Sequence, residues 1–404
     1  MRDVVRDGLS CAGGLAHAAL TLSGLLAAMA GAAARGPASS PAAPVAPIEH
    51  RIDFAEHARL APRSLLLALA RAGARLVAVG ERGHVLLSDD DGRSWIQARS
   101  VPTRALLTGV CFFGPEQGVA VGHDEVILAT ADAGQTWSLI HSAPEAQQPL
   151  LDVTCSTDGR AIAVGAYGTW FASGDGGASW QEHKLAAPGP EGGDLHLNRI
   201  AAASATRLYI AGEGGHLYRS DDRGESWQAL KSPYDGSFFG VKPLTADIVL
   251  AFGLRGNLFR SEDAGTSWRR IETGTHALLD DAAVVPGKAA SGAGAGNPGT
   301  LRAIVGLSGV VLVSRDNGQS FALTQQADRK GLSAALALDS STLVAVGEGG
   351  ARLIRLEPDS REFVSHFPIN EEKAGLRPVQ ADNRSRAEPL AKFHDRITRR
   401  YMNQ

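Results

Sequence analysis

Residues 77–95 read Val77-Ala78-Val79-Gly80-Glu81-Arg82-Gly83-His84-Val85-Leu86-Leu87-Ser88-Asp89-Asp90-Asp91-Gly92-Arg93-Ser94-Trp95. The stretch predicts two short strands, with one tight turn after Gly80 and a second turn between Ser88 and Trp95. The chain repeats this pattern, and the equivalents of its first glycine are Gly80, Gly122, Gly165, Gly212, Gly253, Gly306 and Gly347, about 41 to 53 residues apart. A period of this length is typical of the blades of a β-propeller.

The second turn carries the pattern Ser/Thr-x-Asp-x-Gly-x-Ser/Thr-Trp, which resembles the Asp-box, or bacterial neuraminidase repeat. Its aspartate and closing aromatic residue are Asp90 and Trp95, Asp132 and Trp137, Asp175 and Trp180, Asp222 and Trp227, Asp263 and Trp268, and Asp316 and Phe321. The short carboxylate can accept N–H bonds across its own turn, and the glycine supplies a positive φ. The aromatic ring offers roughly 150–250 Å² of surface for burial. We therefore assign structural roles to these residues.

Seven landmarks with four short strands each predict an all-β fold, a seven-bladed β-propeller of four-stranded antiparallel blades with Asp-box turns. The propeller should span residues 49–367. Its seventh blade, Ser333–Arg355, lacks an Asp-box. Two segments are candidates for its outer strand: Glu362–Phe367 and the segment before the repeats, Ile52–Leu60.

Three regions lie outside the repeats. Residues 1–34 combine Arg2 and Arg6 with a long apolar run and predict a signal peptide or an uncleaved N-terminal anchor. Residues 35–48 are a Pro/Ala-rich linker, and residues 368–404 are a basic C-terminal tail with a short helix. The leader predicts export, with the propeller in the periplasm or membrane-anchored and facing the periplasm.

Charge and cysteine content exclude some functions. A net charge of −3 gives no argument for binding nucleic acid. Cys111 and Cys155 fall at equivalent positions of adjacent repeats, where we expect two buried thiols in preference to a disulfide. Because no cysteine and histidine spacing fits a zinc site, we expect no metal and no cofactor. We also expect a monomer.

Asp-box propellers include sialidases, so a glycoside hydrolase or a glycan-binding propeller is the alternative function. Such an enzyme needs an arginine cluster, a Tyr–Glu nucleophile pair and an acidic residue on long, dissimilar loops. The repeats here are short and alike, with five tyrosines in the chain, and the Asp-box carboxylates are committed to turns. We therefore expect no enzymatic activity.

With no enzymatic activity expected, we expect the protein to act through a binding surface. In an up-and-down blade, the turns between second and third strands and the loops between blades lie on one face, which we call the turn face. The Asp-box turns lie on the opposite face, the box face. Arginine and aromatic residues are enriched at protein interfaces, and the predicted partner-binding residues of the turn face are Arg82, Arg104, His123, Tyr167, Tyr234, Phe238, Arg255 and Arg329.

Three stretches carry a family resemblance: Val79–Trp95, Ser232–Gly240 and Phe252–Ser261. They resemble the photosystem II assembly/stability-factor-like propellers, over about residues 60–356. In photosynthetic organisms that family chaperones assembly of a membrane complex, and similar exported proteins of non-photosynthetic bacteria are thought to serve other envelope machinery. The resemblance implies a protein-binding assembly or accessory factor whose partner is an envelope membrane complex or transporter.

Overall fold

The computed structural model describes residues 53–185, 195–285 and 300–356. The predicted leader, linker and basic tail lie outside these ranges, as does Glu362–Phe367. The chain divides into two units, residues 1–51 and 52–404, and the described residues belong to the second. Within them, no helix has both the length and the apolar character needed to cross a membrane.

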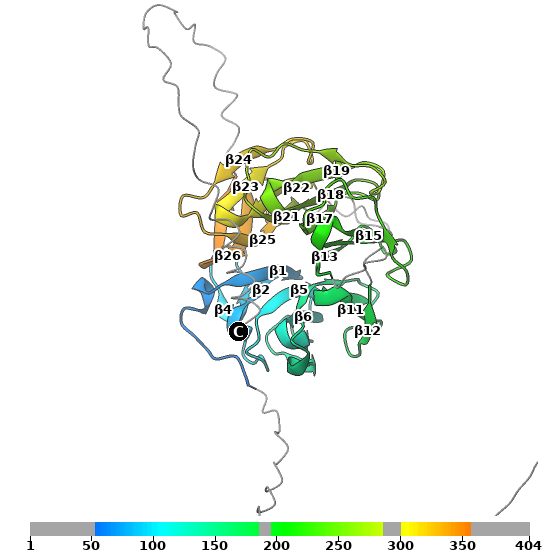
Figure 1. Ribbon diagram of the computed structural model, residues 1–404. Coiled ribbons are helices and arrows are strands. Elements are labelled where there is room, and N and C mark those ends of the chain that lie inside the picture. The colour runs from blue at the N-terminus through cyan, green and yellow to red at the C-terminus, as the bar shows by residue number, and fades with distance from the viewer. Residues whose placement is uncertain (1–52, 186–194, 286–299, 357–404) are drawn as a thin grey trace, which may run out of the picture. The chain divides into compact units, whose positions relative to one another are not determined.

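The described residues form seven antiparallel sheets around a common axis, which confirms the seven-bladed propeller (Figure 1). Blade 1 contains β1 (Leu66–Ala72), β2 (Arg75–Gly80), β3 (Val85–Ser88) and β4 (Ile96–Gln97). Blade 2 contains β5 (Leu107–Phe112), β6 (Gly118–Gly122), β7 (Ile127–Thr130) and β8 (Ser138–His141). Blade 3 contains β9 (Leu150–Cys155), β10 (Ala161–Gly165), β11 (Thr169–Ser173) and β12 (Gln181–Lys184).

The remaining blades follow the same order. Blade 4 contains β13 (Leu197–Ala202), β14 (Leu208–Gly212), β15 (Leu217–Ser220) and β16 (Gln228–Ala229). Blade 5 contains β17 (Phe238–Pro243), β18 (Val249–Gly253), β19 (Leu258–Ser261) and β20 (Arg269–Arg270). Blade 6 contains β21 (Leu279–Val285), β22 (Thr300–Gly306), β23 (Val310–Val313) and β24 (Ala322–Gln325). Blade 7 contains β25 (Leu332–Ala337), β26 (Thr342–Gly347) and β27 (Gly350–Arg355).

Short 3₁₀ turns complete the fold. Six of them join second to third strands: η2 (Glu81–Gly83), η3 (His123–Glu125), η5 (Ala166–Gly168), η6 (Glu213–Gly215), η7 (Leu254–Gly256) and η8 (Leu307–Gly309). The other two are η1 (Ala61–Arg63), before blade 1, and η4 (Pro144–Ala146), between blades 2 and 3.

The second strands are buried along their length, because both faces of each blade pack against neighbouring blades. Val77, Ala78 and Val79 of β2 are fully buried, and β6, β10, β14 and β18 are buried at every residue. This explains why these strands read as continuous apolar runs rather than as alternating patterns. The outer strands β16 and β20, by contrast, are exposed.

The Asp-boxes form the predicted turns between third and fourth strands. In blade 1, Ser94 donates two hydrogen bonds to Asp90, from its backbone N–H (2.9 Å) and its hydroxyl (2.6 Å). The Ser88 hydroxyl donates a third (2.8 Å) and accepts the N–H of Gly92 (2.8 Å). The bonds from Ser94 and Ser88 lower the pKa of Asp90 to about 2. The carboxylate is therefore committed to its turn, as predicted.

Each box also holds its blade against the preceding one. Trp137 of blade 2 is 5% exposed and packs in a cluster with Val77 and Leu87 of blade 1. Around the ring, a Cβ on Gly92 of blade 1 would approach Val344 of blade 7 to 2.9 Å. The box of the first blade therefore packs against the last blade, where β1 lies beside β25.

Two expectations need correction. Cys111 and Cys155 form a disulfide instead of two thiols, because the equivalent ends of β5 and β9 bring their Cα atoms to 5.6 Å. The segment before the repeats does not supply the outer strand of blade 7, because its described part contains no strand. Ala55 instead donates to the carbonyl of Val101, and Ala58 to the side chain of Gln97, so this segment lies against blade 1.

Candidate functional site

The turns between second and third strands share one conformation. The tip of each lies two residues after the landmark glycine, and φ is between 55° and 59° at the tips Arg82, Asp124, Tyr167, Gly214, Arg255 and Ser308. Such left-handed backbone is uncommon for residues other than glycine. The side chains of Arg82, Asp124, Tyr167 and Arg255 are exposed at these tips. The fold thus presents a ring of equivalent tip positions whose residue types differ from blade to blade.

The loops between blades pack directly on these turns. A Cβ on Gly83 would come within 2.1 Å of the carbonyl oxygen of Thr103, and the N–H of Gly83 donates to Ala105. Only a glycine with φ of +69° permits this approach. The loop residue Arg104 therefore lies next to the Arg82 turn, and it also forms an ion pair with Glu56 at 3.0 Å.

The same contact recurs in other blades. Tyr167 donates its N–H to Nδ1 of His196 (3.4 Å), and their rings lie 5.0 Å apart. A Cβ on Gly215 would come within 2.1 Å of the carbonyl oxygen of Tyr234, and one on Gly309 within 3.3 Å of the Cα of Arg329. The structure thus brings each of these loop residues beside a turn, which sequence spacing alone did not show.

The aromatic candidates divide by exposure. Tyr167 is 36% exposed, and Tyr234 is half-buried against Phe238 and Phe259, with ring centroids 6.0 and 6.1 Å away. Phe238 is fully buried in a core cluster with Val241 and Phe259. Phe238 is therefore a support for Tyr234 and not a partner-binding residue, which corrects the sequence prediction.

The remaining candidates are charged. Arg255 and Arg329 are exposed, whereas His123 is half-buried and burial lowers its pKa. The exposed tip of that turn is Asp124, one residue further along the chain. The exposed positive charges among the predicted residues are therefore arginines, and His123 is not one of them.

The inner strands add a polar group that the sequence analysis missed. Each inner strand has a β-bulge at its second residue, for example between Leu279 and Asp281. Asp280 is the bulged residue there, and burial raises its pKa to about 8 although the positive charge of Arg199 opposes that rise. Arg199 donates to the carbonyl oxygen of Asp280 (2.8 Å), and its Nε lies 3.9 Å from the carboxylate of Asp152.

This polar group had a signal in the sequence. Asp152, Arg199 and Asp281 occupy one repeat position, the third residue of an inner strand, where other blades have alanine or glycine. Charges at a position that is otherwise small and apolar mark a place where blades 3, 4 and 6 differ from the repeat. Inner strands begin at the turn face, so Asp280 lies near that face.

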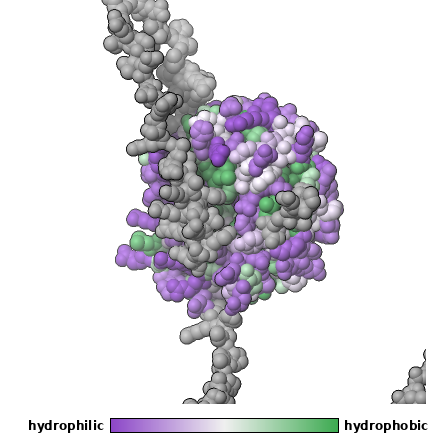
Figure 2. Space-filling view, in the orientation of Figure 1, coloured by the Kyte–Doolittle hydropathy of each residue, from purple (hydrophilic) through white to green (hydrophobic). Residues whose placement is uncertain are grey.

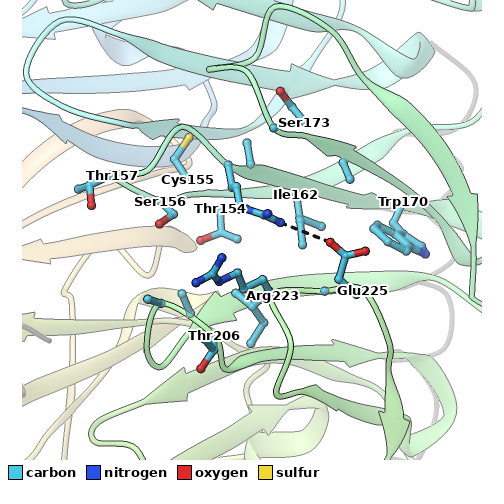
Figure 3. Close-up of a pocket in the computed structure, with 18 of the residues that line it drawn as sticks. Thr154, Cys155, Ser156, Thr157, Ile162, Trp170, Ser173, Thr206, Arg223 and Glu225 are labelled. Carbon is cyan, nitrogen blue, oxygen red and sulfur yellow. Dashed lines mark hydrogen bonds and ion pairs between the residues drawn. The ribbon is translucent and has the colours of Figure 1, made fainter. Parts of the chain in front are cut away.

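A groove opens on the other side, between blades 3 and 4 on the box face (Figure 3). Its volume is about 990 Å³, and its walls include Cys155, Trp170, Arg223 and Glu225. Arg160 bridges the groove by donating to Glu225 (3.4 Å). The sequence analysis assigned no role to this groove.

The surface seen from one side is mainly polar (Figure 2). On the face shown in Figure 2, hydrophilic residues predominate and hydrophobic residues form small, separate patches. In residues 53–185, 195–285 and 300–356, no group of three or more histidine, cysteine or acidic side chains is arranged to hold a metal ion.

The match to a known protein family lies within the repeats. Residues 131–287 match the model of the photosynthesis system II assembly factor YCF48. The matched segment includes the boxes of blades 3, 4 and 5 and the turns of Tyr167 and Arg255. No curated protein matches the chain in sequence.

Solved structures support the same fold. "YCF48 bound to D1 peptide" aligns with a TM-score of 0.58 and 17% identity, over 76% of this chain and 97% of that one. YCF48 from Cyanidioschyzon merolae aligns with a TM-score of 0.55 and 15% identity, over 74% and 97%. The WD40 propeller domain of Doa1 gives 0.56 and 12%, over 77% and 97%. At these identities the structural likeness shows the fold alone, a β-propeller.

Proposed function

We propose that this chain is a non-enzymatic, exported propeller that binds a protein partner, as an assembly or accessory factor for a membrane complex or transporter of a bacterial envelope. The observation that carries the proposal is the match of residues 131–287 to an assembly-factor family. One structure of similar fold is YCF48 with a bound D1 peptide. We place the source among non-photosynthetic bacteria, so the partner of this chain is a different envelope protein.

The turn face is the proposed docking surface. Arg82 and Arg255 stand at equivalent tips with exposed guanidinium groups, which can bind carboxylates or carbonyl oxygens in a bidentate manner. Tyr167 of blade 3 and Tyr234, between blades 4 and 5, add aromatic surface to the same face, and Phe238 packs against the ring of Tyr234. Arginine and tyrosine are the residue types that dominate binding energy at protein interfaces.

A non-enzymatic role agrees with the hydrogen bonds that the Asp-box carboxylates make within their own turns. Asp90 and Asp175 each accept hydrogen bonds from two serines of their own turn. These bonds keep the acids ionised and occupied, so they are unsuited to proton transfer. Burial raises the pKa of Asp280, the positive charge of Arg199 opposes that rise, and the neighbouring carboxylate of Asp281 adds to it.

Export is part of the proposal. The disulfide between Cys111 and Cys155 supports it, because disulfides persist mainly in oxidising compartments such as the periplasm. Fractionation followed by intact-mass analysis tests it. A periplasmic protein that begins near Ala28–Ala34 supports cleavage, a membrane-bound protein that begins at Met1 supports the anchor, and a cytoplasmic protein contradicts export.

Position-specific photo-crosslinking tests the docking surface. A photoreactive amino acid is placed at Arg82, Tyr167 or Ser308 on the turn face, or at Arg93 or Gln319 on the box face, in cells of the source organism. The proposal predicts one shared crosslinked envelope protein from the turn-face positions and none from the box-face positions. Crosslinks to the same protein only from the box face would contradict it.

A further inference from the structure

The groove between blades 3 and 4 lies at a position where arginine side chains bridge other pairs of blades (Figure 3). Arg219, in the third strand of blade 4, donates to the carbonyl oxygen of Ala264 in the Asp-box of blade 5 (2.9 Å). Arg260, in the third strand of blade 5, donates to that of Asn317 in the box of blade 6 (2.8 Å). Each accepting residue directly precedes the glycine of its box. One arginine thus connects the third strand of a blade to the box of the next.

Blade 3 has small residues in place of this arginine and its carboxylate. The register of the second and third strands places Ala172 at the position of Arg219. Arg219 is also paired with Asp221, two residues later (3.0 Å), whereas Gly174 stands two residues after Ala172. Ala172 and Gly174 both line the groove. The loss of these two long side chains therefore helps to open it.

The junction between blades 2 and 3 is filled in another way. Phe113 directly follows the inner strand of blade 2, is 7% exposed and lies against the box of blade 3, where a Cβ on Gly177 would be 3.7 Å from its ring. The residue directly after the inner strand of blade 3 is Ser156, which lines the groove. Protein interiors have few voids larger than a water molecule, so a groove of about 990 Å³ is a departure from the repeat. Ligand sites are commonly about 300–1,000 Å³ in volume.

The acceptor for the missing arginine is still in place. In the box of blade 4, the residue before the glycine is Arg223, and it lines the groove. Its backbone resembles that of Ala264, because φ is 68° and 58° at the two residues. Their N–H groups also donate to equivalent loops, at Thr206 and Asp247. Among the described residues, no group donates a hydrogen bond to the carbonyl oxygen of Arg223. A buried or half-buried acceptor of this kind favours a ligand that carries N–H donors.

The charges around the groove favour a cation. Its walls and rim hold three carboxylates and two guanidinium groups: Asp158, Asp175 and Glu225, and Arg160 and Arg223. Arg160 lies 3.4 Å from Glu225 and 3.9 Å from Asp158. The side chains of Arg160 and Glu225 are 41% and 73% exposed, so water screens their attraction and a ligand can replace it at little cost. One more positive charge would balance the group.

We propose that this groove binds an arginine side chain of another protein, whose guanidinium donates to the carbonyl oxygen of Arg223 and pairs with Glu225. The bound side chain would restore the bond that Arg219 makes one junction further along the ring. A guanidinium has five N–H donors in a fixed plane, so it can bond a carbonyl and a carboxylate together, as Arg219 does with Ala264 and Asp221. The site lies on the box face and does not depend on the docking surface proposed for the turn face.

Binding of a blocked tripeptide tests the proposal. The probe is acetyl-Gly-Arg-Gly-amide, in which the guanidinium is the only charge, and the control probe carries citrulline, which has the same shape without the charge. NMR titration of the full chain is expected to show saturable shifts of the backbone amides of Ala172 and Gly224 with the arginine probe. The citrulline probe should bind at least tenfold more weakly. No saturable shift, equal affinities, or shifts confined to other blades would overturn the proposal.

A variant that fills the groove tests its location. Ala172→Arg with Gly174→Asp gives blade 3 the pair that Arg219 and Asp221 form in blade 4. The new arginine should occupy the site, raise Tm and weaken binding of the probe at least tenfold. Full binding by this variant would overturn the proposal.

Arg160→Ala keeps the proposal testable if the filled variant does not fold. Arg160 is exposed, so its truncation should leave Tm nearly unchanged. It leaves Glu225 without its partner, so the arginine probe should bind at least twofold more tightly. Loss of binding with Arg160→Ala, or tighter binding of the acidic probe acetyl-Gly-Glu-Gly-amide to the wild type than of the arginine probe, would mean that the groove selects an anion and that the proposal is wrong.

Discussion

Cys111 and Cys155 are bonded to each other across 44 residues of chain, and they join the ends of the inner strands β5 and β9. The bond connects blades 2 and 3 at the box face, beside the groove that Cys155 lines. It is the one disulfide between blades in the described residues. The other blade contacts there rest on packing and hydrogen bonds.

Removal of this link should destabilise the propeller. For a closed loop of this length, the chain-entropy model gives a loss of about 4 kcal/mol in the free energy of unfolding. We expect the double variant Cys111→Ala with Cys155→Ala to unfold at a clearly lower urea concentration. Cys11→Ala, which leaves the bond intact, is the control. A midpoint shared by the double variant and the wild type would argue against a disulfide in the native protein.

Truncation of a box tryptophan should also be costly. Trp137 is 5% exposed, donates its indole N–H to Gly134 (2.9 Å) and packs against blade 1. Trp137→Ala should therefore lower the free energy of unfolding by about 3–5 kcal/mol. Ile96→Ala, at a side chain 63% exposed, should change it by less than about 0.5 kcal/mol. Equal effects in urea melts would refute the packing role of the box.

The box carboxylates predict a loss of stability in acid. Hydrogen bonds hold the pKa of Asp90, Asp175, Asp222 and Asp263 at about 2, below the value of about 3.9 in an unfolded chain. The folded state therefore binds fewer protons between these values. Their stabilisation is complete above about pH 4 and is lost as the pH falls toward 2. Asp90→Asn should reduce the fall of Tm in this window.

Asp91→Asn is the matched control, because Asp91 is the exposed neighbour in the same turn. It should leave the slope of Tm against pH close to that of the wild type. If Asp90→Asn also keeps the wild-type slope, the hydrogen bonds of the box do not cause the fall of Tm in acid.

Asp280 predicts the opposite pH dependence. Burial raises its pKa to about 8, so the folded state retains a proton that the unfolded state has lost above about pH 4. Ionisation of Asp280 thus opposes folding increasingly as the pH rises from about 4 to 8. Asp280→Asn should raise Tm at pH 8, and the gain should shrink toward pH 4. A gain that does not vary with pH, or one matched by the exposed Asp235→Asn, would contradict this role.

The repeat architecture was predictable because one local pattern determines it. Gly80 and its equivalents, together with Asp90 and the other box residues, specify turns whose geometry depends on a few adjacent residues. The blade number and the position of each box followed from counting them. The two faces followed from the alternation of strand direction.

Side-chain burial and pairing across blades were harder to predict. Phe238 begins an inner strand and points into the core, although it follows the turn-like residues Asp235-Gly236-Ser237. The disulfide depended on how closely two neighbouring inner strands approach, which repeat spacing alone does not give. Asp124, and not His123, lies two residues after Gly122 and therefore at the exposed tip of that turn. For Phe238 and the disulfide, a contact between blades decided the outcome.

Charge reversal, with binding measured to the identified partner, tests most directly whether the turn face is the docking surface. Once crosslinking has identified the partner, its affinity is measured for the wild type, for Arg255→Glu on the turn face and for Arg93→Glu on the box face. Both arginines are exposed, so neither change should shift Tm appreciably. The account predicts that Arg255→Glu weakens binding more than tenfold, a loss above about 1.4 kcal/mol, while Arg93→Glu binds like the wild type. Loss of binding with Arg93→Glu and full binding with Arg255→Glu would place the docking surface on the other face.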